Sequence, residues 1–335
     1  MTALATDVAG IGNAIVDVLA KADEALLARE GLAKGAMTLI DAQRAEQLYA
    51  AMGPAREVSG GSAANTLVGV AQLGCRAAFI GKVRNDQLGG IFRHDIRAAG
   101  VAFDTPPTTA GAPTARCLIL VTPDAQRTMN TYLGACVELG PDDVDPAVVQ
   151  GAKVTYLEGY LFDRPEAKQA FVKAAELAHA AGRKVALSLS DPFCVARHKA
   201  EFQALVEGHV DLLFANQVEA QALTDSADVA AAAAALAGKT EVAVITMSAQ
   251  GALVQGGPDR HMIEAHPVRE LVDTTGAGDL FAAGFLAGYV RGKSLADCGH
   301  LGALAAAEVI SHYGARPEAD LKDLAARHFG PGFLA

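Results

Sequence analysis

The chain has 335 residues, 51% of them hydrophobic and 34 of them glycine, which suits a compact α/β enzyme of one large domain or two smaller ones. A formal net charge of −10 without a Lys/Arg-rich run argues against nucleic acid or an anionic membrane as the main partner. The sequence shows no 18-residue uncharged apolar span and no basic, signal-like start, so we expect a cytoplasmic protein.

The N-terminal third predicts a strand followed by helices and a second strand. A buried strand over 7–12 delivers Asn13 and Asp17 just beyond its carboxyl end, where open α/β sheets bind ligands. The elements expected next are helices at 42–52, 62–73 and 86–99 and a strand at 77–81. Short β-prone pieces broken by Gly and Pro occupy about 14–40 and 101–132, and we expect these two segments to form a small lid outside the main sheet.

From residue 153 strands and helices alternate regularly, which predicts a parallel sheet covered by helices. The strands are expected at 153–157, 184–189, 210–214, 242–246, 251–255 and 260–266. The helices are expected at 165–181, 195–207, 217–223, 230–235, 276–291 and 294–313. No flexible linker interrupts the pattern, so we expect one domain plus the lid.

The most informative segment runs from Asp273 through Thr274, Thr275, Gly276, Ala277 and Gly278 to Asp279, directly before an apolar helical run. Its small residues let backbone N–H groups approach a ligand at a helix start whose dipole favours negative charge. Asp279 then lies beside this anion site, where a carboxylate can deprotonate a hydroxyl that attacks a phosphoryl group. A tight turn with a capping acid is the plainer alternative.

Two further segments carry polar side chains at predicted helix starts. Gly60-Gly61 permits close backbone approach, and Asn65 on the following turn can bond a polyol, although two glycines before a helix usually form only a turn. Asn216 and Glu219 share one helix face and suit the outer shell of a magnesium-bound phosphate, while a capping box is the alternative.

Polar side chains also follow the predicted strand over 242–246. Thr246 and Ser248 can offer hydroxyls and amides to a nucleotide. This turn, Asn216 and the anion loop all follow predicted strand ends, so they can share one crevice.

With these pieces in this order, the chain resembles the ribokinase-like (PfkB) carbohydrate and nucleoside kinases, and most closely their adenosine kinase branch. The resemblance runs from about Val8 to Pro317 and is most specific in Asp273–Asp279. Its other parts are Gly12–Asp17, Gly60-Gly61 with Asn65, Asn216 with Glu219, Leu187–Phe193, Val210–Asn216 and Cys298–His300.

The resemblance implies a Rossmann-like doubly wound, mainly parallel sheet flanked by helices, with a small β lid. ATP and Mg²⁺ would lie on one side of the crevice and a ribose-bearing acceptor on the other, and a monovalent cation such as K⁺ is left open. In this scheme Asp279 is the base, and the amides of Gly276, Ala277 and Gly278 stabilise the transferring phosphoryl group. The implied acceptor ligands are Asn13, Asp17, Gly61 and Asn65.

The same resemblance assigns the nucleotide side of the crevice. Asn216 and Glu219 would order the hydration shell of Mg²⁺ and phosphate. The implied ATP contacts are Thr246, Ser248, Gly251, Thr274 and His300. Ser248 replaces a glycine of the family's turn and is tolerable there only if its backbone avoids left-handed angles.

Lid residues complete the expected site. Arg127 and Asn130 match a lid region that approaches the phosphates or acceptor in such kinases, and an arginine on a closing lid can neutralise transition-state charge. Tyr160 and the lid residues Met37 and Leu39 are candidates for the purine side. Arg84 stands where the family often has glycine.

The sequence therefore favours an ATP-dependent nucleoside kinase, most of all one that converts adenosine to AMP. A sugar kinase or a kinase for inosine, guanosine or cytidine stays open, as do a monomer and a homodimer. A catalytically silent nucleotide-binding regulator would not need Asp279. A dinucleotide-dependent oxidoreductase is disfavoured because the glycines after the first strand do not complete G-x-G-x-x-G.

Overall fold

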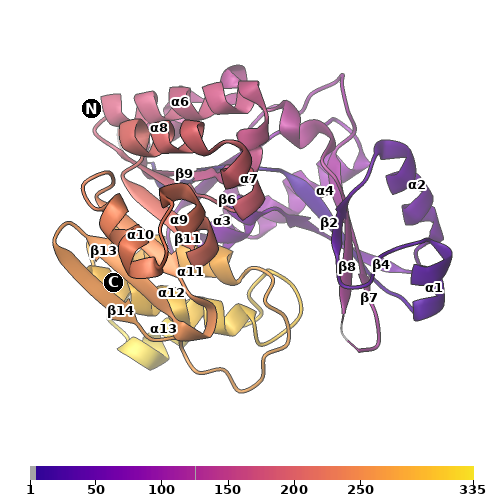
Figure 1. Ribbon diagram of the computed structural model, residues 1–335. Helices are drawn as coiled ribbons and strands as arrows, with labels where there is room; N and C mark the ends of the chain where they lie inside the picture. Colours follow the sequence, from indigo (N-terminus) through magenta and orange to yellow (C-terminus); the bar gives the residue numbers. More distant parts are fainter. Residues whose placement is uncertain (1–4, 125) are drawn as a thin grey trace.

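The computed structural model describes residues 5–124 and 126–335 and contains two β-sheets (Figure 1). The larger sheet has nine strands in the order β14-β13-β12-β11-β10-β9-β1-β5-β6. Their bounds are β1 Thr6–Ile11, β5 Ala77–Ile80, β6 Val101–Ala102, β9 Ala152–Glu158, β10 Lys184–Ser188, β11 Leu212–Asn216, β12 Val242–Thr246, β13 Ala252–Gly256 and β14 Asp259–Ile263. Pairing is parallel from β12 to β6 and antiparallel from β12 to β14.

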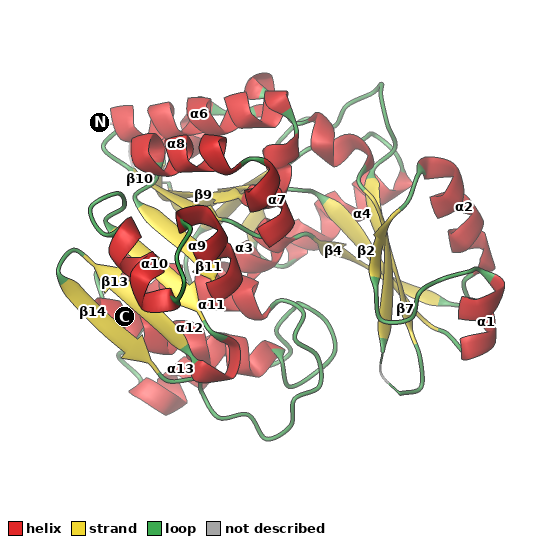
Figure 2. Cartoon of the chain, in the orientation of Figure 1, coloured by secondary structure: helices red, strands yellow, loops and turns green. Residues whose placement is uncertain are grey.

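Helices cover both faces of this sheet, which explains why its central strands are apolar runs rather than alternating ones (Figure 2). One face carries α3 Ser62–Gln72, α4 Gln87–Ala98, α11 Ala277–Tyr289, α12 Leu295–Val309 and α13 Leu321–Phe329. The other carries α5 Pro146–Gln150, α6 Pro165–Ala180, α7 Pro192–Arg197, α8 Lys199–His209, α9 Gln217–Thr224 and α10 Val229–Leu236. Two apolar clusters, one on each face, form the core. The doubly wound fold is confirmed.

The smaller sheet stands apart from the helical layers, with α1 Glu24–Arg29 and α2 Ala42–Ala51 on its outer side (Figure 1). Its order is β3-β8-β7-β2-β4, and the strands are β2 Ile15–Lys21, β3 Met37–Leu39, β4 Ala55–Gly60, β7 Ala115–Val121 and β8 Arg127–Tyr132. The segments 14–40 and 101–132 supply four of these strands. The fifth, β4, was not predicted, because its Ala55-Arg56-Glu57 start is exposed and polar.

The predicted helix over 195–207 is wrong in its extent. Two helices replace it, because the side chain of Asp191 accepts a 2.7 Å hydrogen bond from Cys194 N and starts α7 at Pro192. The chain then turns at His198, where α8 begins. Helix α13 was not predicted either. In the described part of the chain, no helix is both long and apolar enough to cross a membrane.

Candidate active site

The carboxyl ends of the central parallel strands bring several predicted residues to one edge of the large sheet. Asn13 follows β1, Asn216 ends β11, and Thr246 ends β12 in register with Asn216. Parallel strands place their carboxyl ends at the same edge of a sheet, which is where open α/β sheets bind ligands. These three residues therefore lie at one edge of the large sheet, and the crevice that they would share stays a prediction.

The anion loop depends on a glycine with a left-handed backbone. Gly276 is the N-cap of α11 at φ 82°, and a Cβ there would lie 2.8 Å from the Cα of Ala315. Asp273 fixes the turn: one carboxylate oxygen accepts from Thr275 N at 3.0 Å, and the other accepts from Gly314 N at 3.0 Å. No described atom lies within 4 Å of a Cβ placed on Gly278, so the helix start faces open space.

Asp279, on the first turn of α11, is held by two donors from α3. Ser62 Oγ donates to Oδ1 at 2.6 Å, and Asn65 Nδ2 donates to Oδ2 at 3.0 Å. Burial raises the pKa of Asp279, while these hydrogen bonds and the nearby charge of Arg316 oppose the rise. The result is an oriented carboxylate with more basic character than an exposed aspartate.

The Gly60-Gly61 pair allows the end of β4 to pass close to Asn13 and Asp17. A Cβ on Gly61, whose φ is 99°, would overlap the carbonyl oxygen of Asn13, and a Cβ on Gly60 would overlap the carboxylate of Asp17. The glycines therefore serve close approach as well as the turn.

Asp17 shares its surroundings with Asp279. Burial raises the pKa of Asp17 to about 6, with Arg316 and Arg127 opposing the rise and the negative charge of Asp279 adding to it. Two carboxylates thus lie in one poorly solvated region beside two arginines.

Sequence reasoning missed Glu158, at the end of β9. Its buried carboxylate accepts from Asn13 Nδ2 at 2.7 Å, from Asn13 N at 3.2 Å and from Ala63 N at 2.7 Å. Burial raises its pKa to about 7 despite these bonds. Its position directly after a buried strand, like that of Asn13, was the signal that could have revealed it.

Arg316 was also missed. Its guanidinium donates to Ser59 O at 2.6 Å and to Ala64 O at 3.2 Å, joining β4 to α3. Burial lowers its pKa to about 10. No sequence signal marks this residue, because it lies in the loop between α12 and α13.

Several buried polar atoms of the residues that contact or neighbour Glu158, Asp279 and Asp17 find no hydrogen-bond partner among the described residues. They are Oδ1 of Asn13, Oδ1 of Asn65, and Nε and one Nη of Arg127. Each such atom costs about 1–3 kcal/mol when left unpaired in the folded protein. Two free acceptors and an arginine with free donors fit a ligand that carries both hydroxyl and anionic groups.

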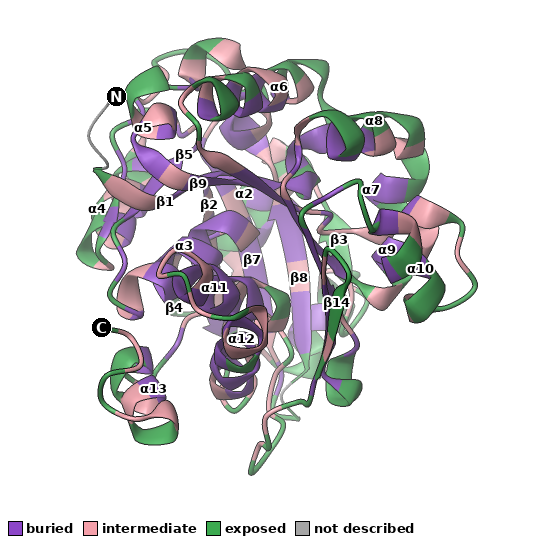
Figure 3. Ribbon diagram, turned by 90° about the vertical axis from the view of Figure 1, so that its left-hand side faces the viewer, coloured by how far each residue is buried: buried purple, intermediate pink, exposed green. Residues whose placement is uncertain are grey.

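Arg127 and Asn130 point to opposite faces of the smaller sheet. Thr131 pairs with Cys117 and Cys117 with Asp17, so Arg127, four residues before Thr131, lies on the face of Asp17, whereas Asn130 pairs with Leu118 on the face packed against α2. The structure therefore removes Asn130 from the expected ligand set. Figure 3 shows β7 and β8 as largely buried.

Arg127 joins the smaller sheet to the anion loop. It forms a 2.7 Å ion pair with Asp273, and its guanidinium lies 5.7 Å from the ring centre of Tyr313. Burial alone would raise the pKa of Asp273, but bonds from Gly314 and Thr275 and the charge of Arg127 lower it.

Asn216 and Glu219 form a capping box. Asn216 Oδ1 accepts from Glu219 N at 2.9 Å, while Asn216 N and Nδ2 donate to Glu219 at 2.9 and 2.7 Å. Burial raises the pKa of Glu219 to about 7. The described residues hold no group of three or more His, Cys, Asp or Glu side chains suited to a metal. This donor set fits only a Mg²⁺ ion that keeps its waters and phosphate ligands.

In the turn after β12, Ser248 does not meet the condition that would make it readily tolerated in place of glycine. Its φ is 52°, so the serine adopts a left-handed backbone. Gly251, at φ 84°, passes so close to Ile263 O that a Cβ would overlap it. Thr274 is exposed at the anion loop, and His300 is exposed on α12.

Comparison with known proteins gives consistent findings. The profile of the pfkB family carbohydrate kinases matches residues 34–321. A probable sugar kinase protein from Rhizobium etli CFN 42 is 52% identical, with a TM-score of 0.89 over 99% of this chain and 100% of that one. Adenosine kinase from Sinorhizobium meliloti is 54% identical, with a TM-score of 0.87, and the match covers 96% of this chain and 99% of that one. Adenosine kinase of Saccharomyces cerevisiae is 28% identical over 327 residues, 91% of this chain and 94% of that protein.

Proposed function

Since the chain belongs to the pfkB carbohydrate kinase family and is an ATP-dependent phosphotransferase acting on a sugar or a nucleoside, we propose that it is an adenosine kinase. The reaction converts adenosine and ATP to AMP and ADP. The 54% identity to an adenosine kinase over nearly the whole chain supports this acceptor.

The observation that carries the proposal is the surface of the smaller sheet beside Asp17. One row of paired residues crosses this sheet from β2 to β3: Asp17 pairs with Cys117, Cys117 with Thr131, and Thr131 with Leu39. Their side chains therefore share one face. Three strand spacings of about 4.8 Å separate the two ends of this row by about 14 Å. The face thus runs from a carboxylate to an apolar side chain, which suits a ribose joined to a base.

Exposed apolar side chains supply the base end. Met37 is 54% and Leu39 61% exposed on β3, and Tyr160, after β9, is 45% exposed. Partial burial, with a smaller effect from the negative charge of Asp279, raises the pKa of Tyr160. A flat aromatic base covers such groups better than a free sugar does.

The ribose end follows from the unpaired acceptors. Hydroxyls of the sugar donate to Asp17 and to the free Oδ1 atoms of Asn13 and Asn65. Asn13 Nδ2 donates a hydrogen bond to Glu158, which fixes the side chain of Asn13. The free oxygen of that amide is therefore oriented before the ligand arrives.

In the proposed chemistry Asp279 accepts the proton of the 5′-hydroxyl as that oxygen bonds to the γ-phosphorus of ATP. The bond from this phosphorus to the ADP oxygen breaks in line. Backbone N–H groups of Gly276, Ala277 and Gly278 stabilise the charge on the transferring group, and Arg127 adds a cation.

Mg²⁺ would neutralise phosphate charge, with Asn216 and Glu219 ordering its waters. Thr246, Ser248, Gly251, Thr274 and His300 form the proposed ATP side. A monovalent cation such as K⁺ stays open.

The test is ADP release from Mg-ATP with adenosine, inosine, guanosine, cytidine, ribose and fructose, on the natural protein and on Asp279→Asn. Adenosine should give the highest kcat/KM, and the variant should lose that turnover. Turnover with a free sugar alone would refute the adenosine assignment while preserving the phosphotransfer chemistry. The sugar kinase is the second candidate, because a probable sugar kinase is 52% identical to this chain.

A further inference from the structure

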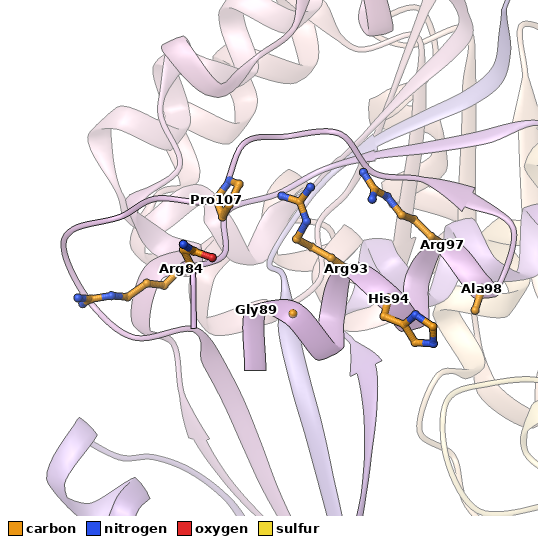
Figure 4. Close-up of a pocket in the computed structure, with 9 residues that line it drawn as sticks. Arg84, Gly89, Arg93, His94, Arg97, Ala98 and Pro107 are labelled. Carbon is orange, nitrogen blue, oxygen red and sulfur yellow. The ribbon is translucent and has the colours of Figure 1, made fainter. Parts of the chain in front are cut away.

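A hollow of ≈ 660 Å³ beside helix α4 gathers positive charge in a chain whose formal net charge is −10. Its lining includes Arg84, Arg93, His94 and Arg97, and the described lining residues include no aspartate or glutamate. Figure 4 shows Arg93 and Arg97 extending from α4 toward the segment that carries Pro107. The hollow shares none of its lining residues with the candidate active site.

Two of these arginines lack an acidic partner among the described residues. Arg93 donates to Thr105 O at 3.2 Å, and its guanidinium lies 5.9 Å from the ring centre of Phe103. Arg84 donates to the carbonyl oxygen of Gly111. Both acceptors are neutral, so the two guanidinium charges are positioned by the backbone but not compensated.

Arg97 adds a third charge one helical turn from Arg93. It donates to Phe103 O and forms a 2.6 Å ion pair with Asp104, an exposed aspartate. Like charges at this spacing destabilise a helix by about 0.2–0.5 kcal/mol. An anion placed between Arg93 and Arg97 would convert this repulsion into attraction.

Two glycines keep the floor of the hollow open. Gly89 passes so close to Arg84 O that a Cβ would overlap it, and this contact holds the Arg84 loop against α4. A Cβ on Gly90 would meet no described atom within 4 Å. The acidic N-cap Asp86 is engaged by Gly89 N at 2.8 Å and by Thr114 Oγ1 at 2.6 Å.

We propose that this basic hollow binds a phosphate group, carried by inorganic phosphate or by a nucleotide. Arg93 bonds only Thr105 O, and Arg97 bonds Phe103 O and Asp104 through Nε and Nη2, so within the described chain both guanidinium groups keep N–H donors for the oxygens of phosphate. Arg84, whose side chain points away from these two in Figure 4 and donates to Gly111 O, lies at the rim of the hollow. This site does not depend on which acceptor the kinase uses.

The position of the hollow suits an effector rather than a substrate. Thr114, the residue before β7, accepts a hydrogen bond from Arg84 N and donates one to Asp86, the N-cap of α4. Asp95 of α4 accepts a 2.7 Å hydrogen bond from Ser59 N of β4. Helix α4 therefore links the hollow to two strands of the smaller sheet, so a bound phosphate can alter how that sheet is held.

The test uses the full chain labelled with ¹⁵N-arginine. The side-chain Nε–H signals of Arg93 and Arg97 are assigned with Arg93→Lys and Arg97→Lys, then followed as inorganic phosphate or AMP is added at constant ionic strength. We expect saturable shifts of both signals. In Arg97→Gln the affinity read from Arg93 should fall about tenfold or more, because a charge-assisted bond is lost. Lys239→Gln removes an exposed charge paired with Glu207 and should change nothing.

Tighter binding of AMP would identify a nucleotide as the source, and equal or tighter binding of inorganic phosphate would identify the free anion. Either result supports the site. No shift with either ligand, or an unsaturated shift matched by chloride, would overturn it. A shift that comes from binding at the candidate active site would keep its affinity in Arg97→Gln, so an unchanged affinity in that variant would also overturn the proposal.

Discussion

Gly276 and Gly278 lie two residues apart at the start of α11, yet the structure gives them different sensitivities to the same substitution. Gly276→Ala forces an alanine to φ 82° and places its Cβ 2.8 Å from the Cα and Cβ of Ala315. The backbone angle alone costs about 1–2 kcal/mol, and the contact with Ala315 adds to that. We expect the free energy of unfolding to fall by at least this amount, and activity to fall with it.

Gly278→Ala is the matched substitution. Its backbone angle is ordinary, and no described atom lies within 4 Å of the added Cβ. Alanine favours a helix interior over glycine by about 0.8–1 kcal/mol, so stability should hold or rise. The methyl group instead occupies space before the helix start, where we place the transferring phosphoryl group, so kcat should drop.

Urea unfolding and ADP release on the two variants separate these effects. We expect a stability loss only for Gly276→Ala, and a loss of kcat without a stability loss for Gly278→Ala. Unfolding of Gly276→Ala at the same urea concentration as the natural protein, or full turnover by Gly278→Ala, would refute these assignments.

Three further predictions concern charged groups. Asp279→Asn keeps an acceptor for Ser62 but removes the base, so kcat should fall about 10²- to 10⁴-fold; steady-state kinetics within tenfold of the natural protein would contradict the assignment. The pKa of Asp17 is raised from 3.8 to about 6, so its ionisation destabilises the fold as pH rises between these values. The free energy of unfolding of Asp17→Asn should therefore equal that of the natural protein below pH 4 and exceed it by up to about 3 kcal/mol above pH 6. Thermal unfolding at several pH values measures this difference, and a difference that is the same at every pH would contradict the assignment. Arg127→Gln leaves the carboxylate of Asp273 without its cationic partner, so the free energy of unfolding should fall by about 3–5 kcal/mol. Part of this loss should be restored in Arg127→Gln/Asp273→Asn. A double-mutant cycle measured by denaturant unfolding tests this, and a coupling energy near zero would exclude the ion pair as a stabilising contact.

Local patterns in the sequence predicted most elements of the large sheet and the helices around it. The periodicity of strands and helices is encoded in short stretches of sequence. A glycine in a left-handed conformation and a capping box are also encoded by residues close together in the chain. Gly276 and the Asn216–Glu219 pair were therefore accessible to sequence reasoning. Local reasoning failed at α7, where the cap of Asp191 outweighed periodicity, and at β4, whose polar start carries no strand signal.

Only the tertiary structure decided which distant residues meet. Asp279 and Ser62 lie 217 positions apart, and no local pattern encodes their hydrogen bond. Strand register, set by pairing across the smaller sheet, separates Asn130 from Arg127. Arg316 and Glu158 enter the site through loop and strand-end positions fixed by packing. The sequence thus determined the local conformations and the chemistry of the anion loop, whereas contacts between distant segments determined the electrostatics of the site, because charge interactions depend on distance in space.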